Sequence, residues 1–353
     1  MDFSLFYFAN DSGTDGSGYE LLLEGAKFAD QNDFTAVWTP ERHFHPFGGT
    51  YPNPSVTGAA IAAVTERIGI RAGSVVAGLH HPLRIAEEWA VVDNISGGRA
   101  GISLASGWHA ADFCFNPSAY ESRKTGLFDQ ADTVRRLWRG EELQVTDGTG
   151  GPATVRSYPR PVQPELPVWI TSGGDPRTVE ETGRRGHGLL THLLGQDLDQ
   201  LAAKITAYRK AVADRPDADG RPGHVAVMVH AFLGEDDDAI RETVRRPLSA
   251  YLRSSLGLLL GSGLGSARKV DPSQLRERDI DFLVARAFDR YYDDGGLLGD
   301  VDKALRVVRR LKDIGVDEVA CLIDFGVPTD QVLAGLTHLD RLRRLSQHDG
   351  ENS

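Results

Sequence analysis

Cysteine is nearly absent from this sequence, since its 353 residues include only Cys114 and Cys321. Two cysteines so far apart do not make the disulfide framework of a small secreted protein, and neither lies in a CxxC zinc motif. The N-terminus also lacks a basic region followed by a long apolar run, so we expect no secretion signal and no membrane span. These absences predict a protein of the reducing cytoplasm.

Basic clusters are missing as well. The net charge is −11 at pH 7, and no block or stripe of lysine and arginine interrupts it. We therefore expect neither nucleic acid nor an anionic membrane as a partner. The chain has 11 histidines but no HExxH helix, so no metal site is predicted. No GxGxxG motif follows the first expected strand, which argues against a tight built-in dinucleotide site.

Short β-branched and aromatic runs alternate with longer segments of helical periodicity, a pattern typical of repeated βα units around a parallel sheet. The expected strands cover residues 2–9, 34–39, 68–76, 99–106, 167–172, 187–194, 224–233 and 317–325. Eight strands close a (β/α)8 TIM barrel, so the predicted fold class is α/β of that type. A doubly wound open sheet is the alternative. Helices with apolar residues at helical spacing are expected over 18–32, 82–95 and 302–314.

Two stretches are longer than ordinary connections. Residues 141–166 are polar and rich in glycine and proline, which predicts a hairpin excursion, and residues 247–300 contain a glycine-rich part at 256–263. Long inserts on a barrel are usually lids or substrate walls. Because barrel periodicity resumes after them, we expect a single domain over residues 1–346 and a polar tail at 347–353.

In a parallel barrel the carboxyl ends of all strands point to one face, so residues that follow the strands converge there. At the expected strand ends these residues are mostly small, polar or ionisable. They are Asn10, Glu41 to His45, Ser74 to Leu79, Ser106 to His109, Ser172 to Asp175, and Thr191 with His192. We therefore expect one functional site on this rim.

Several motifs together resemble a known family. They are the segment Glu41 to His45, the His81-Pro82 helix start, the pair Ala86-Glu87, Asp93 followed by Ser96-Gly97-Gly98-Arg99, and the turn Gly107-Trp108. Over residues 2–345 the chain is similar to bacterial luciferase and its non-luminous flavin monooxygenase relatives, and most similar to the branch associated with polyketide and nonribosomal peptide biosynthesis. The resemblance implies a barrel that binds reduced FMN (FMNH2), forms a flavin peroxide with dioxygen and oxygenates an organic substrate.

The resemblance also implies partners. A separate NAD(P)H:flavin reductase would supply the reduced flavin, and the substrate would be a small molecule or an acyl or aminoacyl group tethered to a carrier protein. A homodimer formed through helices of the early βα units is expected. Two alternatives stay open on the same fold: a hydride-transfer oxidoreductase that uses a deazaflavin coenzyme, and a non-catalytic flavin-binding protein.

The acid and histidine cluster carries the predicted chemistry. His43 is the candidate acid/base, because imidazole exchanges protons near neutral pH and Glu41 beside it can orient or charge it. Arg42 can instead fix an anion. The alternative for His43 and His45 is a hydrogen-bonded pocket wall. His80 and His81 adjoin Pro82 at a helix start, and either one of them reaches the pocket or both lie in a solvated loop.

Two further segments fit a bound flavin. The run Ser172-Gly173-Gly174-Asp175-Pro176-Arg177 offers a glycine turn, a helix start and a guanidinium, which suits a phosphate, although it also reads as an ordinary loop capped by Asp175. Gly73 and Ser74 are small enough for the ring to lie flush against them, at a place where relatives often have a non-proline cis peptide. Simple packing is the alternative there. Ser106, Gly107, Trp108 and His109 are expected to close on the same cofactor.

The sequence also departs from luciferase proper. That enzyme has a histidine pair after the acid and a reactive cysteine at the end of strand four, where this chain has Arg42-His43 and Ala105. Light emission is therefore not expected, whereas oxygen insertion does not depend on the thiol. Cys114, between Phe113 and Phe115, is expected to pack in apolar surroundings.

Overall fold

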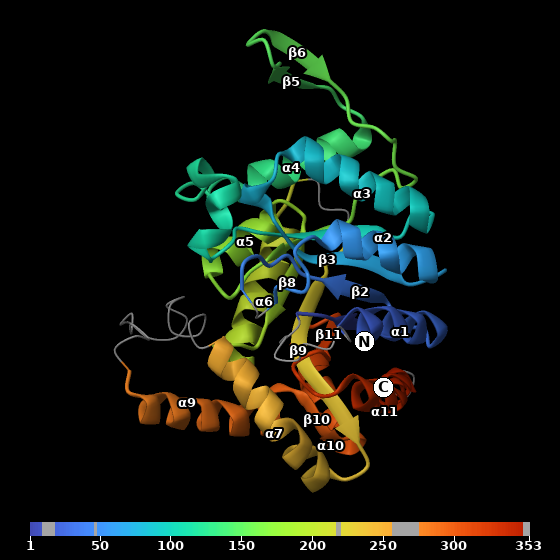
Figure 1. The fold of residues 1–353 in the computed structure, drawn as a ribbon, viewed down its shortest axis with the longest axis vertical. Helices are drawn as coiled ribbons and strands as arrows, with labels where there is room; N and C mark the ends of the chain where they lie inside the picture. Colours follow the sequence, from blue (N-terminus) through green and yellow to red (C-terminus); the bar gives the residue numbers. More distant parts are fainter. Residues whose placement is uncertain (9–17, 46–47, 217–219, 256–274, 349–353) are drawn as a thin grey trace.

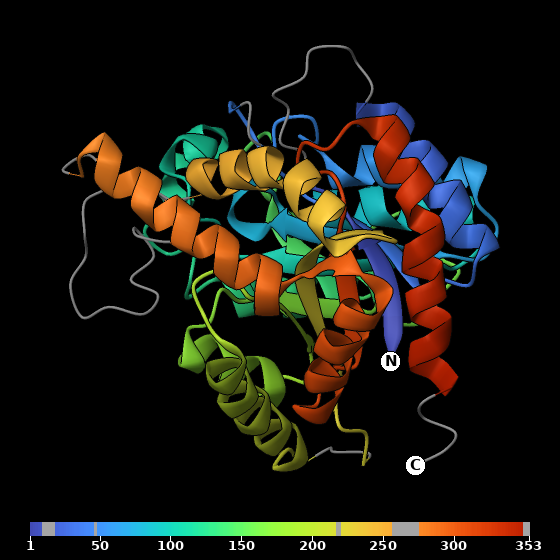
Figure 2. The same ribbon diagram turned by 90° about the horizontal axis from the view of Figure 1, so that it is seen from below.

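The fold is a closed parallel barrel wrapped by helices (Figures 1 and 2). The computed structural model describes residues 1–8, 18–45, 48–216, 220–255 and 275–348. The barrel strands follow the order β9-β11-β1-β2-β3-β4-β7-β8, and a pairing of β8 with β9 closes the ring. This closure confirms the predicted (β/α)8 barrel over the open sheet.

The bounds of the elements are as follows. The strands are Asp2–Phe6 (β1), Ala36–Thr39 (β2), Gly69–Val76 (β3), Ala100–Ala105 (β4), Leu143–Thr146 (β5), Pro152–Val155 (β6), Val168–Thr171 (β7), Gly188–His192 (β8), Val225–Gly234 (β9), Leu297–Asp300 (β10) and Glu318–Leu322 (β11). The helices are Gly18–Gln31 (α1), Pro54–Val64 (α2), Pro82–Ser96 (α3), Leu127–Arg139 (α4), Pro176–Arg184 (α5), Leu198–Ala213 (α6), Asp237–Ser254 (α7), Glu277–Arg290 (α9), Val301–Asp313 (α10) and Thr329–His348 (α11). Short helical turns lie at Ala77–Leu79 (η1), Ala110–Phe115 (η2), Pro117–Ala119 (η3) and Tyr291–Gly295 (η5).

Burial explains why these runs form barrel strands. Every residue of β2, β9 and β11 is buried, as expected for parallel strands covered on both faces. The helix starts follow ordinary capping chemistry, since Asn53 caps α2 and Asp197 forms a capping box with Gln200 at α6. Among the described residues, no helix is both long and apolar enough to cross a bilayer.

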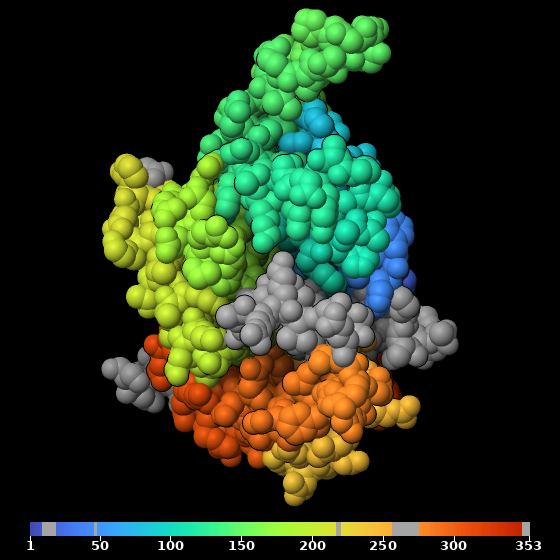
Figure 3. All heavy atoms as spheres, turned by 90° about the vertical axis from the view of Figure 1, so that its left-hand side faces the viewer, coloured from blue at the N-terminus to red at the C-terminus, as the bar shows by residue number. Residues whose placement is uncertain are grey.

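All eight expected strands are present, with ends that differ by a few residues from the predicted ones. The hairpin expected within 141–166 is the antiparallel pair β5–β6, which projects away from the barrel (Figures 1 and 3). The region 247–300 contains α9 and also β10, which the sequence did not predict and which pairs in parallel with β9. Asn10, the glycine-rich part at 256–263 and residues 349–353 lie outside the described residues.

A charged plug closes the amino end of the barrel. The Glu318 carboxylate is fully buried and accepts hydrogen bonds from Arg71 Nη1 (2.6 Å), Trp38 Nε1 (2.8 Å) and Ser4 Oγ (2.5 Å). The Arg71 guanidinium lies over the rings of Trp38 and Trp169, at 4.9 and 4.6 Å from the ring centroids, and these two rings meet edge to face. This end of the barrel is thus filled and leaves the opposite end for a site.

The motif that runs from Asp93 to Arg99 has a scaffold role. Buried Asp93 accepts hydrogen bonds from the backbone N–H groups of Val162 (2.8 Å) and Gln163 (2.9 Å), which fixes the chain that returns from the β5–β6 hairpin. Gly97 ends α3 with a positive φ of 70°. The Arg99 guanidinium then donates to the carbonyls of Thr65 (2.8 Å) and Ile68 (2.7 Å), tying the end of α2 to the start of β3.

We expect Asp93→Asn to lower the free energy of unfolding by about 2 kcal/mol, because one oxygen that accepts N–H bonds becomes an amide donor inside the protein. Chemical denaturation with urea measures the change. Asp199→Asn, at an exposed position in the first turn of α6, is the matched control and should change stability by less than about 0.5 kcal/mol. Equal stability of the two variants would contradict the scaffold role.

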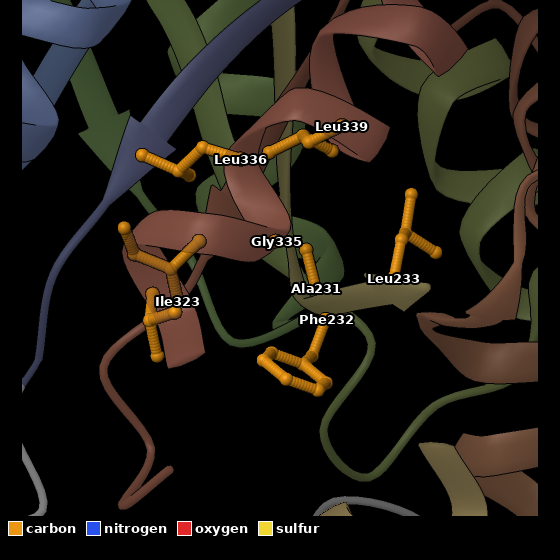
Figure 4. Close-up of a pocket in the computed structure, with 8 residues that line it drawn as sticks. Ala231, Phe232, Leu233, Ile323, Gly335, Leu336 and Leu339 are labelled. Atoms are coloured by element: carbon orange, nitrogen blue, oxygen red, sulfur yellow. The ribbon is translucent and has the colours of Figure 1, made fainter. Parts of the chain in front are cut away.

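The last helix packs against the barrel with one small gap. Between α11 and strands β9 and β11 lies an apolar hollow of about 10 Å³, bordered by Phe232, Leu336, Leu339 and their neighbours (Figure 4). A space of this size holds at most about one water molecule. It is a packing gap and not a ligand site.

Candidate active site

A cavity of about 1040 Å³ opens among the carboxyl ends of the barrel strands. Pockets that hold a small ligand usually measure about 300–1,000 Å³, so this one has room for a cofactor and a substrate together. The predicted site residues that border it are Glu41, Arg42, Gly73, Ser74, Ser106, Gly107, Trp108, Ser172, Gly173, Gly174 and Arg177. Two predicted residues, His43 and His109, do not border the cavity themselves and contact residues that do.

A buried carboxylate gathers three donors on one wall of the cavity. Glu41 Oε1 is hydrogen-bonded to His43 Nε2 (2.9 Å) and to His80 Nε2 (2.6 Å), while Oε2 accepts the backbone N–H of Val76 (2.7 Å). Burial by itself would raise the pKa of Glu41, but the hydrogen bonds from His43 and His80 outweigh it and lower the pKa. The carboxylate is therefore ionised at neutral pH.

Of the two adjacent histidines His80 and His81, only His80 contacts the site. It reaches Glu41, whereas His81 lies at the surface and caps α3 by accepting the N–H of Leu83 (3.2 Å). Burial tends to lower the pKa of His80, yet the hydrogen bond and the charge of Glu41 raise it. His80 therefore belongs to the site, and His81 is part of the scaffold.

Arg42 is not the free anion anchor that the sequence allowed. Its Nη1 is paired with the carboxylate of Asp112 at 2.9 and 3.2 Å, and its guanidinium lies over the Trp108 ring at 4.8 Å. Asp112 also bonds His109 Nδ1 at 2.9 Å, which explains why His109 turns away from the cavity. The buried Arg42 Nε nevertheless has no acceptor among the described residues. One N–H of this guanidinium is thus available to a ligand.

Small residues form part of the cavity wall. The Gly73–Ser74 peptide is cis, and a Cβ added to Gly73 would lie 2.7 Å from the Phe6 ring. Gly107 has a φ of 74°, and a Cβ there would lie 2.8 Å from Val76. Ser74 is hydrogen-bonded to Thr171. Packing within the protein therefore excludes larger side chains at positions 73 and 107, and the backbone itself borders the cavity there.

The segment between β7 and α5 forms the predicted turn at the cavity rim. Ser172 Oγ accepts the N–H of Gly174 (3.2 Å), whose φ is 113°, and Asp175 caps α5 by accepting the N–H of Arg177 (3.1 Å). The Arg177 side chain is 92% exposed and stands at the mouth. The same segment therefore forms both the glycine turn predicted to bind a phosphate and an ordinary helix start capped by Asp175. The cap already uses the N–H of Arg177.

The mouth carries more cations than the sequence indicated. Arg123, Lys124 and Lys204 border the cavity in addition to Arg177. Arg123 lies over the Tyr120 ring at 4.0 Å, and its buried Nε has no acceptor within the described residues. A guanidinium N–H without a partner suits an anion, and a glycine turn and a helix start border the same cavity.

The far side of the cavity, along β8 and β9, is largely apolar and neutral. Leu190, Leu194, Met228 and Tyr251 border it together with His192. Burial lowers the pKa of His192 to about 4, so this imidazole is uncharged at neutral pH. The cavity thus has one charged, hydrogen-bonding side and one side suited to an apolar ligand.

The sequence missed Asp112 and Arg123. Asp112 lies in η2 and Arg123 just before α4, so neither follows a strand directly. The prediction that Cys114 packs in apolar surroundings is wrong, since Cys114 and the neighbouring Phe115 are exposed and only Phe113 is buried. The sequence of η2 does not indicate which of its residues are buried and which are exposed.

Relatives of known name share both sequence and fold with this chain. It is 22% identical over 352 residues to the oxygenase component of a flavin-dependent trigonelline monooxygenase of Acinetobacter baylyi, covering 96% of this chain and 93% of the relative. It is 27% identical to 4-hydroxyprotoasukamycin monooxygenase of Streptomyces nodosus subsp. asukaensis, covering 59% of this chain and 58% of the relative.

Solved structures agree on the fold. Monooxygenase RslO1 of Streptomyces bottropensis superposes with a TM-score of 0.76 at 23% identity, covering 97% of this chain and 98% of that one. The oxygenating constituent of 3,6-diketocamphane monooxygenase of Pseudomonas putida, in complex with FMN, gives 0.71 at 17% identity and 97% of both chains. An F420-dependent secondary alcohol dehydrogenase gives 0.70 at 16% identity and 97% of both chains.

The family model described as luciferase-like monooxygenase matches residues 1–318, which is most of the chain. This match confirms the resemblance drawn from the motifs, and the monooxygenase relatives agree with it. The relatives are flavin-dependent enzymes, and this chain, an enzyme of the same kind, belongs to the luciferase-like monooxygenase family.

Proposed function

We propose that this chain is the oxygenase component of a two-component monooxygenase that uses reduced FMN. The observation that carries the proposal is one cavity that combines a wall of small residues, an Arg123 Nε–H without an acceptor among the described residues, and the Glu41 carboxylate with its two imidazoles. When bound, reduced FMN would supply the electrons that activate dioxygen and deliver one oxygen atom to the substrate.

The residues present fit that cofactor. We assign the flavin phosphate to the turn Ser172–Gly174 with Arg123 and Arg177, because phosphate binds well to helix starts and guanidinium groups. Gly73 and Ser74 would lie against the planar ring, since a larger residue at position 73 would meet Phe6. Ser106, Gly107 and Trp108 would close on it from β4.

The polar cluster supplies the acid and base groups. We propose that Glu41 and His43 hold and move the proton that the reaction needs, while Arg42 Nε–H binds an oxygen of the substrate or cofactor. The apolar side along β8 and β9 would receive the organic substrate. A natural-product intermediate, free or tethered to a carrier protein, suits a cavity of this size.

Two protein partners follow from the proposal. A separate NAD(P)H:flavin reductase would provide the reduced flavin, as the relative named an oxygenase component implies for its own system. A homodimer would cover the exposed apolar side chains of α2 and α3, where Val56, Val91 and Ile95 are 65%, 43% and 51% exposed. We expect the protein to act in the cytoplasm as a single barrel domain.

A second candidate is a deazaflavin-dependent hydride transfer. The observation that favours it is the group of cations at the mouth, Arg123, Lys124, Arg177 and Lys204, because a deazaflavin coenzyme has a longer anionic tail than FMN. The buried carboxylate with two imidazoles serves either reaction, because hydride transfer between an alcohol and a carbonyl also moves a proton. The monooxygenase relatives favour oxygenation.

Isotopically labelled dioxygen tests the proposed function. The protein is supplied with FMN, NADH, a flavin reductase and a panel of aromatic and polyketide-like compounds. One labelled oxygen atom per product molecule, and none in the absence of the protein, is the expected result in mass spectrometry. Substrate reduction with a reduced deazaflavin, or substrate oxidation with an oxidised one, in either case without oxygen incorporation and without activity with FMN, would reject it in favour of hydride transfer.

The phosphate assignment makes a separate prediction. Arg123→Gln should weaken reduced FMN binding by about 10- to 100-fold, the range expected for one hydrogen bond to a charged group. Riboflavin, which lacks the phosphate, should bind the variant and the unaltered protein equally in an anaerobic fluorescence titration. Arg136→Gln, on the exposed face of α4, is the control. Equal weakening of FMN and riboflavin would show that Arg123 only supports the fold.

A further inference from the structure

The carboxylate of Glu41 is shared by two imidazoles in an unusual way. Both His43 Nε2 (2.9 Å) and His80 Nε2 (2.6 Å) reach the same oxygen, Oε1, while Oε2 is held by the N–H of Val76. An ionised carboxylate only accepts hydrogen bonds, so each imidazole carries a proton on Nε2. A neutral His43 therefore keeps its lone pair on Nδ1.

The two imidazoles differ in their surroundings. The His80 side chain is 26% exposed and receives further charge from Glu88 and Arg84 of α3, of which Glu88 favours the imidazolium and Arg84 opposes it. From α4, the neutral Gln130 amide donates to the His80 carbonyl (3.3 Å). The His43 side chain is 10% exposed and packs against the rings of Phe44 and Phe115.

Charge therefore divides unequally among the three groups. The Glu41 side chain is fully buried and must be compensated, because an isolated buried carboxylate is costly. His80, which has solvent on one side and the shorter hydrogen bond, is the better place for the compensating proton. With an ionised Glu41 and a cationic His80 the pair is neutral, and His43 next to it can exchange its own proton without facing an uncompensated charge.

We propose that His80 is a positioning residue that sets the protonation of His43 through their shared carboxylate. Like His43, His80 does not border the cavity; it acts only by holding Glu41, which does border it, and by neutralising the charge of that carboxylate. The inference rests on the proposed function for its catalytic meaning, since His43 is the acid/base of that reaction. The effect of the His80 charge on the protonation of His43 depends on the protein alone, and it is present whether or not a flavin is bound.

The direction of the effect follows from Coulomb's law. When the His80 charge is removed, His43 faces an ionised Glu41 without compensation, and this favours the protonated form of His43. The titration midpoint of His43 should then move to higher pH by about one unit, a tenfold change in its protonation equilibrium. Replacement of His80 by another cation should leave the midpoint near its original value.

Three variants of the full-length protein test this by NMR titration of the imidazole ring protons without any flavin. His80→Gln keeps an N–H donor and loses the charge, and His80→Lys keeps both. His81→Asn is the control, because His81 is adjacent, exposed and caps α3, a role that asparagine fills. We expect an upward shift of the His43 midpoint in His80→Gln alone. Circular dichroism establishes that each variant is folded, and if His80→Gln does not fold, His80→Asn, which also keeps an N–H donor and loses the charge, takes its place.

An activity measurement links the shift to catalysis. In the oxygenation assay, the pH profile of kcat for His80→Gln should move to higher pH by the same amount as the NMR midpoint, with KM for the substrate unchanged. An unchanged His43 midpoint in folded His80→Gln, or equal shifts in all three variants, overturns the inference. Failure of the unaltered protein to oxygenate any compound would instead count against the proposed function, because the NMR result does not depend on it.

Discussion

Glu41→Gln should reduce the turnover number for substrate oxygenation by about 100-fold or more, the lower end of what general acid–base groups contribute. The carboxylate accepts three hydrogen bonds, from His43, His80 and the Val76 backbone. A neutral amide has one accepting oxygen and presents an NH2 group where another acceptor is needed. The variant therefore loses both the charge and the geometry that hold His43.

The same variant should bind reduced FMN within about threefold of the unaltered protein, since the phosphate assignment does not involve Glu41. Single-turnover kinetics with pre-bound flavin separate chemistry from binding. Glu24→Gln removes a carboxylate that forms an exposed ion pair with Lys27 and should change neither quantity. A Glu41→Gln protein with unaltered turnover would show that the acid/base group lies elsewhere in the cavity.

Glu318→Gln should lower the free energy of unfolding by about 3–5 kcal/mol, the usual result of removing one partner of a buried ion pair. It would leave the Arg71 guanidinium over two tryptophan rings without its carboxylate, and it would place an amide N–H near donors from Ser4 and Trp38. Glu165→Gln breaks an exposed pair with Arg139 and should cost less than about 1 kcal/mol.

The pH dependence of this loss has a definite sign. Burial tends to raise the pKa of Glu318, but the charges of Arg71 and His224 and the hydrogen bonds lower it below the ordinary value of 4.5. A group whose pKa is lowered on folding stabilises the protein above its ordinary value, and that contribution disappears as pH falls through the lower, folded value. Urea unfolding at several pH values should therefore show a large difference in the free energy of unfolding between Glu318→Gln and the unaltered protein near neutrality, and a smaller difference in acid. A difference that grows as pH falls would refute the role of the ionised carboxylate.

The barrel could be predicted from the sequence because its strands are buried on both faces and read as short apolar runs. β10 escaped prediction because its four residues, Leu-Leu-Gly-Asp, are too few to show a period and contain a glycine that suggests a turn. The end of α7 was assigned to an insertion for a related reason, since Pro247 inside it resembles a helix stop.

The site could be predicted in part, through topology. Residues that follow β2, β3, β4 and β7 meet in one cavity because parallel strands end on one face. Partners that depend on where a loop folds back were out of reach, such as Asp112 for Arg42 and His80 for Glu41. No local pattern reports a contact between residues so far apart in the chain.

The motif from Asp93 to Arg99 has a structural role and not a catalytic one. It supported the family resemblance, yet its side chains bind backbone groups of neighbouring loops and do not border the cavity. Such a motif identifies the family because it fixes the fold on which the site is built. The functional conclusion depends instead on Glu41, Arg123 and the small residues of the wall.

The central claim is that one cavity at the strand ends binds reduced FMN. An anaerobic equilibrium titration of the purified protein with reduced FMN, repeated in competition with a reduced deazaflavin coenzyme, tests it most directly. We expect one FMN to bind per chain, with an affinity that falls in Arg123→Gln and at least about tenfold tighter than that of the deazaflavin. Absence of FMN binding, or preference for the deazaflavin, would contradict the account.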